Sequence, residues 1–518
     1  MRGTKAKQAE EAAARIVWAS HALAFLTEKQ DAGFDRAEDS GSNPTREDEG
    51  EERSTFEDAG HGGVVAELDG SNPNSARPYR ERFLDSAAQL LSPSDAWGHV
   101  VATAMREFAD RVEVDVARND GFTSLPKRPG EIHAVQALCH RLGGFLAGSV
   151  LRGEFENDVI AFNSQRVDAW ARNLEHALRE TAPAPARGNS SRRGSGMSSL
   201  TPAHRTWIEM RRLLWFPRTA TFTTTGLGSH RQQLVRRAYA CVSSPAVHAL
   251  IHTTHPESAE AAWRQLCTLA RPVYDCGVLQ QVAAQRPRFR RVRFQLVVQT
   301  QQQQRLRRRY RLAADAACHR LGLAPMPAGW RPRPDFVAAC RRPRALHAEM
   351  QLVARYYGPP LPYLIADPQQ RSRGRQHHPT LLYFGTSRQP CLLCAGLLCS
   401  LPHGEGGRGP IATRPSHGEC HPVWGVPAPA AKDVAVALRS LEMVLVGKIL
   451  ACLRENLGDA VRRLFVQPRD GHRLTWRKVR MRGGASSTGN GTWQISQHRE
   501  IDLKSKPPNP SKSGPWCI

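Results

Sequence analysis

"RALHAEMQLVARYYG" spans Arg344–Gly358, and "YFGTSRQPCLLCAGLLC" spans Tyr383–Cys399. In the first stretch, apolar residues follow "HAE" at helical spacing and end at a Gly-Pro-Pro break, which predicts a short helix. In the second, an apolar run typical of a buried strand leads into a helix with Pro390 in its first turn, where a missing N–H costs nothing. We therefore expect helix, strand and helix in this order, with one histidine, one glutamate and two cysteines at the helix starts.

Residue types at these helix starts are those of a catalytic zinc site, in which three protein ligands leave a fourth position open. Cys391 and Cys394 stand three residues apart in a first helical turn, so both sulfurs face one side and the helix dipole favours their thiolates. Packing of the "HAE" helix start against that turn would add His347. Glu349 lies two residues further on and points elsewhere, which suits a general acid/base. We predict a Zn²⁺ site with catalytic Glu349 beside it.

Three segments, "LHAEMQLVARYY", "YFGTSRQPCLLCAGLL" and "SHGECHPVWGVP", together resemble the Orientia-type branch of the nucleic acid/nucleotide deaminase superfamily, a branch expanded in fungi. The resemblance covers Asp335–Leu464. It implies an α/β chain whose C-terminal part is a three-layer α/β/α cytidine-deaminase-like domain. It also implies hydrolytic removal of an amine from a nucleobase, cytosine before adenine, in nucleic acid or in a nucleotide.

Site roles follow from the same resemblance, position by position. His347, Cys391 and Cys394 are the implied zinc ligands, and Glu349 is the implied proton shuttle. Further candidates for the substrate pocket are Ala348, Ser387, Pro390, His417 and Trp424.

The chain departs from the family pattern in two respects. His347 and Cys391 are 44 positions apart, which is longer than compact cytidine deaminases show. The excess fits in the loop after the first helix, because lengthening a flexible loop costs little. The early β-hairpin of the fold has no clear sequence signal, and residues 291–300, which alternate apolar and polar side chains, are expected to supply part of it.

Other zinc schemes use the same cysteines. A short knuckle would combine Cys391 and Cys394 with Cys399 and His403, but leucines continue a helix through it. The alternative is a structural site with four protein ligands, in which His417 and Cys420 complete the set with Cys391 and Cys394. A lone CxxC is also compatible with redox chemistry, or with a structural zinc in a non-catalytic protein that binds nucleic acid.

The charge is strongly positive, with 72 lysines and arginines against 48 acidic residues and a formal net charge of +24. The segment 31–69 is acidic, so the excess on the remainder is larger still. Such a field favours nucleic acid or a nucleotide as partner, because phosphate contacts dominate affinity. The alternative is a solvated, arginine-rich surface that reflects a GC-rich genome.

Cysteine usage and hydropathy limit the cellular compartments in which the protein is expected. Twelve scattered cysteines in 518 residues are not a disulfide framework. No secretory signal and no membrane-spanning apolar run is apparent, so we expect no membrane partner and a cytoplasmic or nuclear location.

Composition divides the chain into segments, with both ends rich in polar residues, glycine and proline. The expected divisions are a largely disordered region 1–77, an all-helical domain 78–180, a flexible linker 181–202, a basic and mostly helical region 203–334, the deaminase-like zinc domain 335–464 and a disordered basic tail 465–518.

Overall fold

A computed structural model gives the arrangement of the chain. It describes residues 15–23, 78–119, 121–122, 129–179, 201–215, 224–254, 259–298, 331–332, 334–341, 345–357, 383–401, 411–421, 424–425, 432–455, 465–466, 473–478 and 493–498. The expected linker 181–202 therefore lies outside the described residues except for its last two. Most of the expected disordered region 1–77 lies outside them too, but residues 15–23 are helical.

The chain forms two compact units. One comprises residues 36–304 and 343–441, and it contains every residue proposed above for the site. The other comprises residues 1–35, 305–342 and 442–518.

A mixed five-stranded sheet is the centre of the first unit. Its strands are β1 (Val101–Glu107), β2 (Val112–Arg118), β3 (Val292–Leu296), β5 (Tyr383–Thr386) and β6 (Ala412–Thr413). Their order across the sheet is β3-β2-β1-β5-β6. Strand β1 is antiparallel to both of its neighbours, β2 and β5, whereas β3 runs parallel to β2 and β6 parallel to β5.

The β1–β2 hairpin corrects the expectation that residues 78–180 are all-helical. Val101, Met105 and Val112 recur at helical spacing, but Val112, Val114 and Val116 also alternate with polar residues, and the structure follows this alternation. Valine favours strands because its branched side chain packs well on a pleated surface. The early hairpin is thus residues 101–118. The expectation that residues 291–300 supply part of it was wrong: Val292–Leu296 form β3, a separate strand that lies parallel to β2 beside the hairpin.

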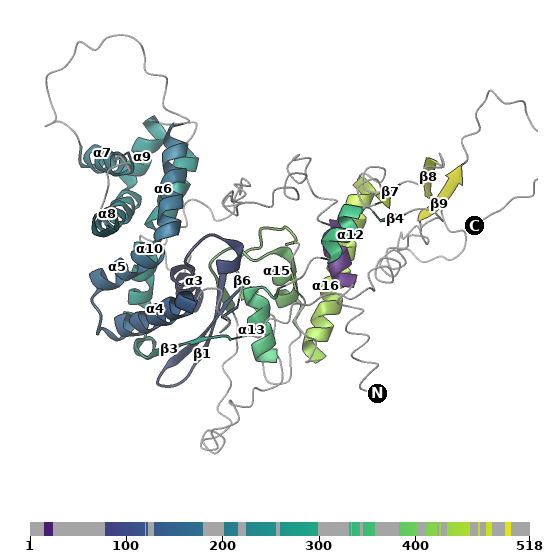
Figure 1. Cartoon of the computed structure of the whole chain (residues 1–518), viewed down its shortest axis with the longest axis horizontal. Helices are drawn as coiled ribbons and strands as arrows, with labels where there is room; N and C mark the ends of the chain where they lie inside the picture. The colour runs from purple at the N-terminus through teal and green to yellow at the C-terminus, as the bar shows by residue number, and fades with distance from the viewer. Residues whose placement is uncertain are drawn as a thin grey trace, which may run out of the picture. The chain divides into compact units, whose positions relative to one another are not determined.

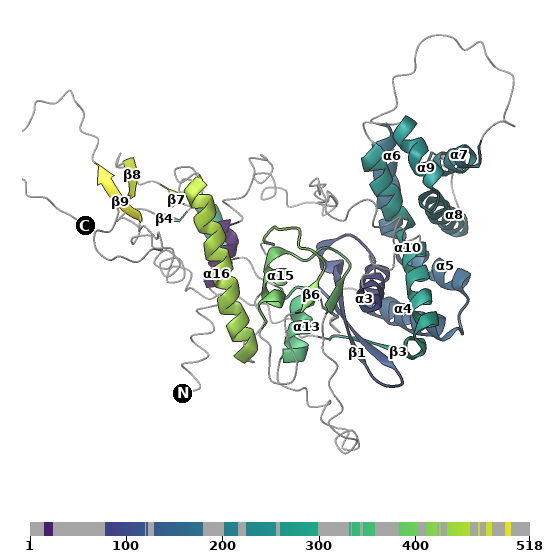
Figure 2. The same cartoon turned by 180° about the vertical axis from the view of Figure 1, so that it is seen from behind.

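Helices cover both faces of this sheet (Figures 1 and 2). On one face, the three alternating valines of β2 pack in an apolar core with residues of α3 (Tyr79–Leu90) and α4 (Pro129–Ala147). On the other face, Asp115 of β2 binds α13 (Ala348–Tyr357): Arg355 Nη2 lies 2.8 Å from its carboxylate, and the Tyr356 hydroxyl donates to it. The C-terminal turn of α13 is thereby held against the middle of β2.

A helical block lies between β2 and β3 in the sequence and has its own core. Its helices are α5 (Arg152–Phe162), α6 (Ser164–Arg179), α7 (Pro202–Leu214), α8 (Thr224–Val242), α9 (Pro245–Thr254) and α10 (Ala259–Gln285). Buried residues such as Trp170, Met210 and Trp263 form that core. Helix α10 also packs on α3, because Cys276 and Leu279 belong to the core beneath the sheet.

Gly385 allows α3 to approach β5 closely. A Cβ at this position would lie 2.4 Å from the backbone carbon of Leu84 and 2.6 Å from its oxygen. We expect Gly385→Ala to lower the free energy of unfolding by at least about 1–3 kcal/mol, because a backbone cannot yield as a side-chain tip can. Chemical denaturation of the variant measures this. Gly153→Ala is the control, since no atom lies within 4 Å of the added Cβ; equal stability of the two variants would contradict the argument.

The second unit is small in its described part. Trp18 packs edge-on against Phe336 with ring centroids 6.1 Å apart, and Arg15 bonds Glu442 at 2.7 Å. The expected disordered tail 465–518 contains three strands, β7 (Phe465–Val466), β8 (Arg473–Lys478) and β9 (Trp493–His498). In β8 and β9, apolar residues alternate with polar ones, which favours an antiparallel pair despite the basic composition.

Bilayer-spanning helices are not found in the described part of the chain: none of its helices is both long enough and apolar enough to cross a membrane.

Candidate metal centre

His347 and Glu349 stand at the start of α13, as the sequence predicts. The backbone carbonyl of His347 accepts the first helical hydrogen bond, from Gln351 N at 3.0 Å, and Glu349 lies in the first turn. Asn119, at the end of β2, accepts the N–H of Ala348 on Oδ1 at 2.7 Å. This bond satisfies one of the free amides of the helix start.

Cys391 and Cys394 stand at the start of the next helix, α15 (Leu392–Cys399). Cys391 is its N-cap, and its sulfur accepts the N–H of Cys394 at 3.5 Å. The segment around residues 417–419 lies alongside: Leu392 N donates to Glu419 O at 2.9 Å, and His417 N donates to Pro390 O at 3.3 Å. Strand β5 leads directly into this turn, so the sheet places both cysteines.

The two helix starts meet. His347 Nδ1 lies 3.7 Å from Cys391 Sγ and 3.4 Å from Cys394 Sγ, and one ligand atom from each of the three residues lies within 4.8 Å of the others. The Glu349 carboxylate is adjacent, with Oε2 3.6 Å from Cys394 Sγ. All four side chains are buried, none more than 5% exposed.

These residues fit a zinc ion. Zinc with standard bond lengths and tetrahedral angles separates a nitrogen from a sulfur ligand by about 3.6 Å, and the two histidine–cysteine distances lie on either side of that value. One imidazole and two thiolates are ligands that zinc prefers, and the nearby carboxylate is not needed to complete the set. Among the described residues, His347, Cys391 and Cys394 form the one group of this kind.

The side chains of this cluster shift one another's pKa values. Burial alone would raise the pKa of the Cys391 thiol, but hydrogen bonding with Cys394 and the charge of His347 lower it well below its usual range. Burial, reinforced by the Cys391 sulfur, raises the pKa of Cys394. Burial also raises the pKa of Glu349. A thiolate is thus already favoured on Cys391, and a bound cation would extend this to Cys394 because metal binding displaces thiol protons.

The alternative zinc schemes are not formed by the described residues. Cys399, at the end of α15, is exposed, and His403 lies outside the described residues. The His417 ring nitrogen accepts the N–H of Glu419 at 3.3 Å rather than joining the cysteines. Cys420 is likewise not part of the cluster.

The other pocket candidates have varied surroundings. Ser387 links the end of β5 to β1, because its hydroxyl oxygen accepts the N–H of Val101 at 2.9 Å. The carbonyl oxygen of Pro390 accepts the N–H of His417. Trp424 is 2% exposed and forms a strand-like backbone bridge with Ala345. It lies close to Cys394 and acts to lower the pKa of that thiol, against the larger effect of burial. Of these candidates, Trp424 lies beside Cys394, and Ala348 stands between His347 and Glu349 in the chain.

Two aromatic residues that the sequence did not single out also contact His347. Trp97 lies 5.6 Å from the imidazole at 66°, and His421 lies 5.0 Å from it at 74°. The two rings stack on each other, 5.3 Å apart at 17°. Burial and the neighbouring His347 lower the pKa of His421 to about 4, so it is neutral near pH 7. Periodicity could not reveal either residue, because Trp97 lies in a single 3₁₀ turn and His421 in an irregular segment.

Comparison with known proteins bears on the same part of the chain. Residues 346–428 match a family model described as OTT_1508_deam-like deaminase. This segment, which contains both helix starts, is therefore similar to a deaminase domain. No curated protein and no solved structure matches the chain significantly. The match supports deaminase family membership for this segment and covers well under half of the chain.

Proposed function

We propose that this protein is a zinc-dependent hydrolytic deaminase that acts on a nucleobase, cytosine before adenine, through a three-layer cytidine-deaminase-like domain. The observation that carries the proposal is the meeting of one imidazole and two sulfurs beside a buried carboxylate. The deaminase match over residues 346–428 supports the reaction class.

The proposed division of labour follows from the positions of the side chains. A zinc ion held by His347, Cys391 and Cys394 would supply Lewis-acid activation of water near neutral pH. Glu349 is buried and its pKa is raised, so its carboxyl group can hold a proton as well as release it. A buried carboxyl group of this kind suits general acid/base work, because it stands beside the proposed metal ligands and burial favours its protonated form.

In the proposed hydrolysis, Glu349 carries both of the protons that move. Water attacks the ring carbon that bears the exocyclic amine, and Glu349 accepts one water proton and passes it to the ring nitrogen. It then takes the second proton of that water from the new hydroxyl group and carries it to the leaving amine. The carbon–nitrogen bond breaks, ammonia leaves, and the ring retains a carbonyl oxygen.

Aromatic rings beside the ligands support a planar substrate. Trp97 and His421 offer stacking surfaces, and bases stack on such rings. Three ring nitrogens at this position, Trp97 Nε1, His347 Nε2 and His421 Nδ1, are buried and lack a hydrogen-bond partner within the described residues. Buried polar atoms are normally satisfied, so these nitrogens are available to a substrate or to ordered water.

The proposed partner is a nucleic acid strand or a nucleotide. Net charge supports it, since +24 attracts phosphate, and a base must leave its stack to reach a buried centre. A cytoplasmic or nuclear location stays part of the proposal.

A direct assay tests the reaction. Purified protein with measured zinc content is incubated with cytidine, adenosine, single-stranded RNA and single-stranded DNA, and products are read as C-to-U or A-to-I changes. We expect C-to-U conversion, and its loss when a chelator removes zinc. Zinc-loaded, folded protein that converts none of these substrates would contradict the proposal and favour a structural zinc in a non-catalytic protein.

A further inference from the structure

The loop before β1, residues 92–100, carries Trp97 against His347 and His421. Its end is a short 3₁₀ turn, Trp97–His99, in which Val100 N donates to Trp97 O at 3.3 Å. Asn119 Nδ2 also donates to Trp97 O, at 2.9 Å. The same asparagine accepts the N–H of Ala348, so this loop and the start of α13 share one anchor.

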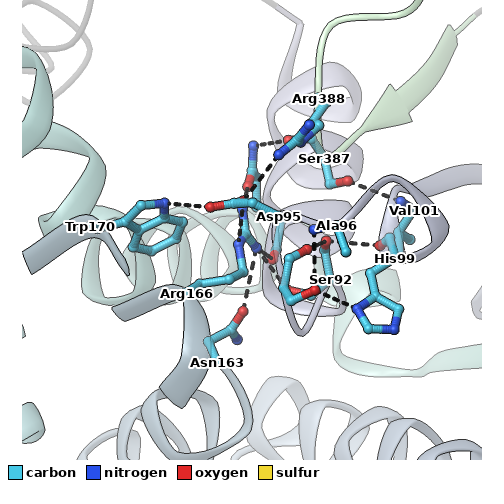
Figure 3. Close-up of polar contacts among 12 residues, drawn as sticks. Ser92, Asp95, Ala96, His99, Val101, Asn163, Arg166, Trp170, Ser387 and Arg388 are labelled. Atoms are coloured by element: carbon cyan, nitrogen blue, oxygen red, sulfur yellow. Dashed lines mark hydrogen bonds and ion pairs between the residues drawn. The ribbon is translucent and has the colours of Figure 1, made fainter. Parts of the chain in front are cut away.

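Arg166 holds this loop from outside the sheet. It lies on α6 of the helical block and is 4% exposed. Its Nε donates to Asp95 Oδ1 at 3.0 Å, and its Nη1 donates to the carbonyl oxygens of Gln89 and Ser92 at 2.9 and 2.8 Å (Figure 3). The guanidinium thus binds both the end of α3 and the loop that follows it.

Asp95 is the point where three parts of the chain meet. Trp170, one turn after Arg166, donates Nε1 to Asp95 Oδ2 at 2.9 Å, and the Arg166 guanidinium lies 4.5 Å from the Trp170 ring (Figure 3). Arg388, three residues before Cys391, places Nη2 3.8 Å from Asp95 Oδ1. The carboxylate that precedes Trp97 by two residues is therefore bound to the helical block and lies near the segment that leads to the cysteines.

The far end of the loop is braced as well. His99 Nε2 lies 2.9 Å from Glu131 of α4, Ser92 Oγ donates to His99 O at 2.9 Å, and His99 Nδ1 is bonded to Ser94. With both ends held, the loop has little freedom, and Trp97 keeps one position beside the proposed zinc ligand. Side chains hold such positions best when surrounding hydrogen bonds fix them.

We propose that Arg166 is a positioning residue for the candidate site: through Asp95 it fixes loop 92–100, and thereby the indole of Trp97 against His347 and His421. The proposal rests on the proposed function and assigns a task to the helical block, which supplies both Arg166 and Trp170. Arginine suits this task because its planar group donates several hydrogen bonds in fixed directions, and lysine cannot reproduce them.

Fluorine NMR of protein labelled with 5-fluorotryptophan tests the proposal. The Trp97 signal is assigned by its absence in Trp97→Phe. In wild type we expect this signal to shift when zinc is added, because the indole lies 5.6 Å from His347. In Arg166→Lys the zinc-dependent shift should fall by about half or more, while zinc content stays unchanged and deamination falls roughly 10- to 100-fold.

Two further variants make the result decisive. Arg179→Lys is the control, since Arg179 lies on the same helix, its side chain is 69% exposed, and it bonds Glu175 of its own helix; it should behave as wild type. Asp95→Asn, at a side chain 35% exposed, replaces Arg166→Lys if the latter does not fold, and should reduce the shift likewise. A wild-type zinc-dependent shift in a folded Arg166→Lys or Asp95→Asn variant overturns the positioning role.

Failure of the proposed function gives a different result. Wild type that binds zinc and deaminates nothing contradicts the reaction, and the fluorine shift still decides the role of Arg166. Wild type that binds no zinc contradicts both proposals.

Discussion

Glu349→Gln is expected to reduce deamination by roughly 10²–10⁴-fold while the protein keeps its zinc. Glutamine has nearly the same shape as glutamate, but it cannot accept and return a proton. The zinc ligands are His347, Cys391 and Cys394 in our proposal, so their set is unchanged. The measurement is the steady-state rate with the best substrate of the assay above, together with zinc content by mass spectrometry.

Glu419→Gln is the matched control for this variant. Glu419 lies on the segment beside α15, and its side chain is exposed, while the contact to Leu392 uses its backbone carbonyl. It should keep wild-type activity. Wild-type activity in Glu349→Gln would remove the proton shuttle from the mechanism, whereas loss of zinc from that variant would make the carboxylate part of the metal site.

Cys394→Ala is expected to lower zinc content from about one ion per chain to nearly none, because a site with three protein ligands has no spare one. The thiol is fully buried, and its sulfur lies 3.4 Å from His347 Nδ1. Zinc that binds only the folded chain stabilises it by about 2.7 kcal/mol at a free concentration 100-fold above the dissociation constant. The variant should therefore lose the zinc-dependent rise in melting temperature that wild type shows.

Cys399→Ala is the control on the same helix. Its thiol is exposed, so neither zinc content nor the effect of zinc on melting temperature should change. If Cys394→Ala retains a full zinc equivalent, the metal is held elsewhere. Loss of zinc from Cys399→Ala would instead support the short zinc knuckle, in which Cys399 is a ligand.

Local signals predicted the elements around the site well. The helix after "HAE", the buried strand at Tyr383 and the helix at the two cysteines all form, since each depends on periodicity and on residues near its own ends. The expectation of an all-helical region 78–180 was wrong at residues 101–118, which form the β1–β2 hairpin, because the spacing of apolar residues there fits a helix as well as a strand. Pairing with neighbouring strands of the sheet resolves this ambiguity.

Residues that surround the ligands could not be predicted in this way. Asn119, Trp97 and Arg166 come from a strand end, an irregular loop and a distant helix, and nothing in their own neighbourhoods marks them. Their role depends on which segments the sheet and the helical block bring together, and that is a property of long-range packing.

The chain by itself determined the chemistry that is available, because the types and local spacing of His347, Glu349, Cys391 and Cys394 place four reactive groups at two helix starts. The tertiary structure alone decided that these groups meet across 44 residues and which aromatic rings lie beside them. Helix starts form from nearby residues, whereas the distance between them is set by the sheet, in which β1 pairs with both β2 and β5. Arg355 of α13 in turn binds Asp115 of β2, which holds that helix against the sheet.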